Sequence, residues 1–247
     1  MGETTLRVEL LRGTENPEEQ VALAAKLCYS AAGIEELRRG VSEQDQTFFV
    51  TKLTDMGHLS PIEHASFTFG VEGVSRSLLA QITRHRIASF SVKSQRYVGE
   101  GSGEQEDGVF NYIIPPRIAQ LGPQEAKEFA GQMAQMQKWY DYWLDKLAGY
   151  GESAREDARF VLPNAAETKL IVTMNARELL HFFNVRCCNR AQWEIRALAT
   201  AMLRLVRRAS PVLFREAGPR CLTAPCPEGR MSCGKQAEVR EKFKQYS

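Results

Sequence analysis

The strongest constraint on the fold of this chain is the order of its helical patterns and its few short strand patterns. Helical periodicity covers most of the sequence, whereas runs of aromatic and β-branched residues are few. Strands and helices do not alternate regularly, so we predict the α+β class, with mixed helices around a small, mostly antiparallel sheet. The expected helices cover 17–30, 43–56, 75–86, 123–150, 153–162, 175–188 and 191–209, and the expected strands cover 4–12, 65–73 and 168–174.

The composition is that of an ordinary globular protein. Of the 247 residues, 43% are hydrophobic and 25% are charged, and no internal repeat or linker interrupts them. We therefore expect 1–247 to form a single domain, with 217–247 a mostly irregular C-terminal tail. No segment approaches the roughly 18 apolar residues that a membrane helix needs, and the N-terminus lacks the pattern of a signal peptide. The expected location is cytoplasmic, with reduced thiols and no membrane partner.

The net charge of +2 hides an uneven distribution of cations. Arginine outnumbers lysine more than two to one, and arginine suits bidentate recognition of phosphate and carboxylate. Residues 81–96 hold four cations and no acid, and 168–196 hold five cations and two acids. We call these two segments the basic islands. They favour a phosphorylated small molecule over a long nucleic acid, which the near-neutral total disfavours, although a solvated charged face remains an alternative.

One segment, 175–188, has the pattern of a helix with two functional faces. At about 100° per residue, Arg177 and His181 share one face, and Arg186 lies on the opposite side. Apolar residues separate the two faces, and a buried arginine is costly unless it is paired. We expect this helix to lie between two binding sites or two subunits.

Several familiar motifs are absent or incomplete. Gly101-Ser-Gly103 lacks the third glycine of a dinucleotide fingerprint, and 229–235 lacks the Ser or Thr of a phosphate loop. Cys221, Cys226 and Cys233 have no nearby histidine to complete a zinc site, so we expect no metal and interpret these cysteines as unpaired thiols.

Residues 84–96 carry the pattern RHR, seven residues, then S-x-R. This pattern resembles the signature of the flavin-dependent thymidylate synthases. Three further stretches are similar to family segments and follow in the family's order, so the resemblance extends over roughly 50–215. They are GHLSPIEHASFTF (57–69), ARFVLP (158–163) and NARELLHFFNVR (175–186) with AQWEIR (191–196).

The resemblance implies an enzyme that converts dUMP to dTMP. Its carbon donor would be methylenetetrahydrofolate, and NADPH would reduce a bound FAD that supplies the hydride. The fold would be that of a flavoprotein without a Rossmann domain, and the assembly a homotetramer whose active sites are shared between subunits. No enzyme cysteine would act as nucleophile.

The resemblance also assigns roles to individual residues. Arg186 matches the arginine that polarises the uracil ring and is the expected catalytic residue. Val92 stands where many relatives carry Glu, so roles of that side chain are not transferred. We call the residues matching dUMP contacts the nucleotide set and those matching FAD contacts the flavin set. The nucleotide set is Gln81, Arg84, Ser94, Gln95, Arg96, Arg159 and Arg186, and the flavin set is Ser60, Arg84, His85, Arg86, Asn175, Arg177 and His181.

Two other functions stay open on sequence alone. The basic islands with Phe90 and Tyr97 would suit a single-stranded nucleic-acid binder, in which aromatic rings stack on bases. A flavoprotein that has lost synthase activity would carry the same flavin set. FAD binding by the purified protein separates the first alternative from the synthase, and an activity assay separates the second.

Overall fold

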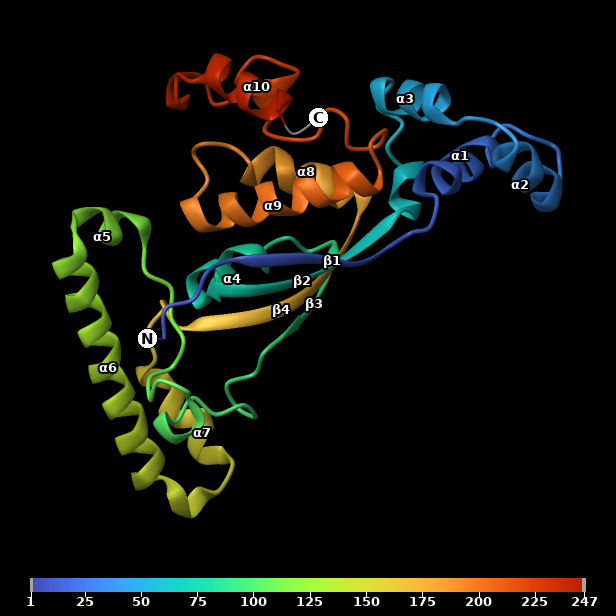
Figure 1. The fold of residues 1–247 in the computed structure, drawn as a ribbon. Coiled ribbons are helices and arrows are strands. Elements are labelled where there is room, and N and C mark those ends of the chain that lie inside the picture. Colours follow the sequence, from blue (N-terminus) through green and yellow to red (C-terminus); the bar gives the residue numbers. More distant parts are fainter. Residues whose placement is uncertain (1, 246–247) are drawn as a thin grey trace. The chain divides into compact units, whose positions relative to one another are not determined.

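A computed structural model describes residues 2–245 and confirms the α+β class. The described residues include ten α-helices and one four-stranded antiparallel sheet with strand order β1-β2-β4-β3 (Figure 1). Among the described residues, no helix is both long and apolar enough to cross a membrane. The strands are β1 (Arg7–Gly13), β2 (Ser66–Ser75), β3 (Ala88–Val92) and β4 (Glu167–Asn175). The α-helices are α1 (Pro17–Leu27), α2 (Ile34–Ser42), α3 (Thr47–Asp55), α4 (Arg76–Ile82), α5 (Pro116–Leu121), α6 (Pro123–Lys146), α7 (Ser153–Ala158), α8 (Ala176–Arg186), α9 (Trp193–Ala209) and α10 (Gln236–Lys244).

The described residues form two compact units. The first unit comprises 2–7, 71–84 and 91–171, and the second comprises 8–70, 85–90 and 172–245. Each of the four strands therefore has residues in both units.

The first unit has its own aromatic core. Phe110, Tyr112, Met133 and Ala166 are buried together, and Phe129 of α6 packs against them. The helix α6 begins at Pro123 and runs for 24 residues. Proline is tolerated in the first turn because the backbone N–H that it lacks would have no partner within the helix.

The second unit is centred on three phenylalanines that pack edge to face. The ring of Phe214 packs edge-on against Phe67 of β2 and Phe183 of α8, with centroids 5.4 and 6.1 Å apart. Helices α8 and α9 lie side by side in this unit (Figure 1). The tail that we expected to be mostly irregular includes α10, and α10 buries Val239 and Phe243.

Most element predictions are confirmed, but α2, α5 and β3 were not predicted. The glycine at the end of 65–73 also predicts that this strand stops there. Instead, β2 continues through Gly73, whose φ of +67° suits glycine, and whose N–H donates to Glu167 Oε1 at 3.0 Å. A side chain there would collide with the backbone, because a Cβ would lie 1.9 Å from the Thr5 carbonyl oxygen.

Segment 99–109 is rich in glycine and acidic residues, which predicts an exposed loop, and this prediction is wrong at its beginning. Glu100 is only 4% exposed, and its carboxylate lies 2.7 Å from Lys93 Nζ. Buried Gln137 of α6 donates to the Glu100 carbonyl at 2.8 Å. The charge of Glu100 is thus buried because it is paired, a condition that a local composition count does not reveal.

Candidate active site

The two-faced helix predicted at 175–188 is α8, and its sequence fixes where it begins. Asn175 is the N-cap, and its side-chain oxygen accepts from Glu178 N at 2.9 Å. Leu179, Phe182 and Phe183 are buried along the helix. Arg177 and His181 are exposed, whereas Arg186 is half-buried at the C-terminal end.

A buried hydrogen-bond chain joins three side chains of the second unit. His85 Nδ1 lies 3.0 Å from Glu178 Oε1, and Arg186 Nε donates to His85 Nε2 at 3.1 Å. His85 and Glu178 are 7% and 8% exposed. Because Nε2 accepts from a guanidinium, the imidazole carries its proton on Nδ1 and donates it to Glu178. We call this arrangement the Glu178–His85–Arg186 chain, and it holds Arg186 through a neutral imidazole.

The electrostatic environment keeps His85 neutral. Burial lowers the pKa of His85, and the positive charge of Arg186 lowers it further, against the opposing effect of Glu178. The ring also packs edge-on against Phe182, with centroids 4.9 Å apart. The imidazole is therefore a fixed acceptor for Arg186.

The flavin set lies almost entirely in the second unit, Arg84 being the exception. Arg177 of α8 forms an ion pair with Glu63, which belongs to the 3₁₀ helix η1 (Pro61–His64), and Ser60 is the exposed N-cap of that helix. The His181 ring lies 5.9 Å from the ring of His85. The structure thus gathers these residues on η1, α8 and the start of 85–90.

The nucleotide set, apart from Arg186, lies in the first unit. Arg96 pairs with Glu156 of α7 at 3.5 Å, which brings the segment after β3 to the helix that precedes Arg159. Gln95 is 8% exposed, and its Nε2 has no hydrogen-bond partner among the described residues. Leaving a buried donor unsatisfied costs about 1–3 kcal/mol, so Gln95 is suited to receive a ligand's acceptor.

Arg76 is a candidate that the sequence did not reveal. Its Nη2 donates to the Lys93 carbonyl at 3.2 Å, and its buried Nε has no partner among residues 2–245. Burial lowers the pKa of Arg76, Glu100 raises it, and the nearby Arg159 lowers it. Two neighbouring guanidinium groups repel each other, and a bound anion that pairs with both relieves this repulsion. One sequence feature could have identified it: Arg76 is a cation in the first turn of α4, where the helix dipole disfavours positive charge.

The basic islands are less cationic in the structure than in the linear sequence. Lys93 pairs with Glu100, Arg96 with Glu156, and Lys169 lies 3.4 Å from Glu72. By contrast, Arg84 and Arg86 are exposed and form no ion pair with any described residue. The cations that remain suit a small anionic ligand better than a polyanion.

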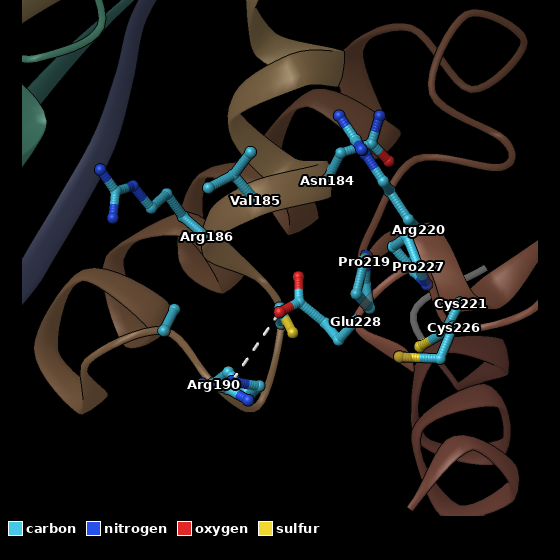
Figure 2. Close-up of a pocket in the computed structure, with 12 residues that line it drawn as sticks. Asn184, Val185, Arg186, Arg190, Pro219, Arg220, Cys221, Cys226, Pro227 and Glu228 are labelled. Atoms are coloured by element: carbon cyan, nitrogen blue, oxygen red, sulfur yellow. Dashed lines mark ion pairs between the residues drawn. The ribbon is translucent and has the colours of Figure 1, made fainter. Parts of the chain in front are cut away.

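A pocket of about 340 Å³ lies in the second unit where α8 ends (Figure 2). Asn184, Val185 and Arg186 line it from α8, and Pro219 and Arg220 line it from the tail. Arg190 and Glu228 form an ion pair across it, with Nε and Oε2 3.9 Å apart (Figure 2).

The Glu178–His85–Arg186 chain predicts how stability depends on pH. The ordinary histidine pKa is about 6.5 and that of His85 is lower, so the unfolded chain takes up this proton first as the pH falls. The free energy of unfolding should therefore decrease below about pH 6.5. His85→Gln keeps a neutral donor and acceptor, so it should show a smaller decrease between about pH 7.5 and about pH 5.5. Urea unfolding at both pH values measures the effect.

Exposed His58 provides the control for that experiment. His58→Gln should keep the pH dependence of the unmodified protein. Equal pH dependence in His85→Gln and the unmodified protein would contradict the neutral assignment.

Comparison with known proteins identifies the family. The model of the family "Thymidylate synthase complementing protein" matches residues 9–212. Three similar proteins are each named flavin-dependent thymidylate synthase. That of Geobacter sulfurreducens is 53% identical over 98% of this chain and all of its own length, that of Clostridium tetani 49% over 96% of each, and that of Pyrococcus furiosus 38% over 90% of each. The matched residues include the RHR pattern as well as Glu178 and Arg186. This protein therefore belongs to the flavin-dependent thymidylate synthase family.

Proposed function

We propose that this chain methylates dUMP to dTMP with FAD as cofactor, methylenetetrahydrofolate as carbon donor and NADPH as reductant. The observation that carries this function is Arg186, which a buried neutral imidazole holds at 3.1 Å. Rigid support of a guanidinium is what recognition of a planar, hydrogen-bonding ring requires.

The flavin set fits FAD chemically. FAD carries an anionic pyrophosphate and a polar ring system, and the set supplies exposed guanidinium groups, an imidazole and a hydroxyl: Arg86, Arg177, His181 and Ser60. When bound and reduced, FAD would supply the hydride for the reaction. The protein's part is to bind and orient it, for which η1 and α8 already lie in contact.

The nucleotide set, together with Arg76, fits dUMP. Arg76 and Arg159 supply neighbouring cations for the phosphate, and the unsatisfied amide of Gln95 supplies a buried donor. Arg186 would donate to the uracil ring and stabilise negative charge that develops on it. Its geometry would be maintained by His85, which we interpret as a positioning residue as well as a member of the flavin set.

The reaction needs no enzyme thiolate. Cys187, which directly follows Arg186, is 2% exposed, and burial raises its pKa to about 12. Its thiol stays protonated at neutral pH and is a poor nucleophile. Electrophilic activation of the substrate by Arg186 takes the place of covalent activation.

We further propose a cytoplasmic homotetramer of single-domain subunits with shared active sites. Exposed aromatic side chains on α6 support an assembly, because Trp139, Tyr142 and Trp143 are 50%, 53% and 43% exposed. Clustered exposed aromatics are typical of protein interfaces.

Reconstitution tests the proposed activity. Purified protein incubated with FAD should retain it as a yellow complex, and dUMP, methylenetetrahydrofolate and NADPH should together yield dTMP. Omission of any one reactant is the control. A colourless protein that cannot be reconstituted would overturn the flavin assignment, and a yellow protein that forms no dTMP would overturn the synthase activity.

Gln95 offers a test that separates binding from stability. Gln95→Leu removes the unsatisfied donor, so the free energy of unfolding should stay constant or rise by about 1 kcal/mol. The Kd for dUMP should rise roughly tenfold or more, as expected for loss of one buried hydrogen bond. Urea unfolding and calorimetric titration with dUMP measure the two effects. Exposed Gln132→Leu is the matched control, and a less stable variant with unchanged dUMP affinity would argue against this role.

The two faces of α8 predict different losses. His181→Ala should weaken FAD binding more than dUMP binding. Arg186→Ala should do the reverse and reduce turnover roughly 100-fold or more. Arg186→Lys should also lose most activity, because an ammonium cannot present a planar fork. Titrations with each ligand check this, and equal weakening of the same ligand by both alanine variants would refute the two-face interpretation.

A further inference from the structure

Four of the six cysteines converge in the second unit, away from any role in the proposed reaction. Cys221, Cys226 and Cys233 belong to the tail, and the fold brings Cys188 to them from the end of α8. Cys188, Cys221 and Cys226 line the pocket of Figure 2. Asn189, the next residue after Cys188, places its Nδ2 3.9 Å from Cys233 Sγ.

The electrostatics also indicate that these thiols are neighbours. Burial raises the pKa of Cys221, and negative charge on Cys188, Cys226 or Cys233 raises it further. Figure 2 shows the sulfur atoms of Cys221 and Cys226 close to each other. All six cysteines are free thiols in the structure.

The segment that carries these cysteines has almost no core of its own. Between Cys221 and Val239 no residue is buried. Its order comes from polar contacts: Gln236 and Arg240 donate to the Cys221 carbonyl at 3.0 and 2.9 Å, and Arg190 donates to the Met231 carbonyl. Short cysteine-rich segments without a core are commonly stabilised by a metal ion.

We propose that Cys188, Cys221, Cys226 and Cys233 bind one structural Zn²⁺ as four thiolates. Binding replaces four S–H bonds with four Zn–S bonds and releases four protons to solvent, with no change of oxidation state. The resulting site carries a net charge of −2, and Arg190 and Arg220, which line the same pocket, offset it. The sequence alone offered no fourth ligand, because Cys188 is distant along the chain.

Closing the site requires the thiol side chains to turn toward one another. Among the described residues, no group of three or more His, Cys, Asp or Glu side chains already has the geometry of a metal site. Cys226 and Cys233 lie outside the helices of the tail and are not buried, so their side chains have room to turn. Coordination of Cys188, two residues after Arg186, would then anchor the C-terminal end of α8.

Metal content of the intact chain tests the proposal without reference to synthase activity. Protein expressed in zinc-supplemented medium and purified without chelator should hold one zinc per chain by inductively coupled plasma mass spectrometry. Cys188→Ser, Cys221→Ser, Cys226→Ser and Cys233→Ser should each lose it. Cys28→Ser, at an exposed position after α1, is the matched control and should retain it.

A second measurement needs no variant and so does not depend on whether a serine variant folds. Zinc-free protein titrated with Co²⁺ under reducing conditions should develop thiolate charge-transfer absorbance and the intense d–d bands of a tetrahedral tetrathiolate. Absence of zinc together with absence of these bands would overturn the proposal. So would mass spectrometry that finds a Cys221–Cys226 disulfide, or a zinc content that survives all four substitutions.

Discussion

The hydrogen-bond chain from Glu178 through His85 to Arg186 is the interaction on which the candidate site depends. It exists because a carboxylate and an imidazole are buried together, each satisfying the other. Removing either partner would leave the second buried and unpaired, a cost of the order of 1–3 kcal/mol or more. Arg186 is thereby directed by His85, which is distant in sequence, and the cap at Asn175 fixes the helix that carries both Glu178 and Arg186.

The three residues of the RHR pattern lie in different environments. Arg84 and Arg86 are exposed, whereas His85 between them is buried. Arg84 lies in the turn after α4, and His85 and Arg86 lie in the irregular segment before β3. The pattern can therefore present two cations to ligands while its central histidine supports Arg186 from within the protein.

Local features of the fold were readable from the sequence, and features that depend on distant pairs were not. Ser75 precedes an apolar helical pattern, as an N-cap does, and the structure shows it capping α4; the predicted helix after Asn175 is likewise confirmed. The burial of Glu100 depends not only on nearby Lys93 but also on Gln137 of α6, and the strand β3 lies inside a segment that composition marks only as basic. Likewise, the resemblance supplied candidate residues, but the bond from Arg186 to His85 joins segments about a hundred positions apart. Arg76 was overlooked because the resemblance assigned it no role.

We propose that the two ligands engage different segments: FAD the residues of the flavin set that lie in the second unit, and dUMP the nucleotide set of the first unit together with Arg186. Hydrogen–deuterium exchange followed by mass spectrometry tests it most directly. FAD alone should protect peptides that cover 57–64, 85–90 and 175–183, and dUMP added to the FAD complex should newly protect peptides that cover 76–84, 93–97 and 156–160. Protection of the same peptides by both ligands, or the reverse assignment, would contradict the account.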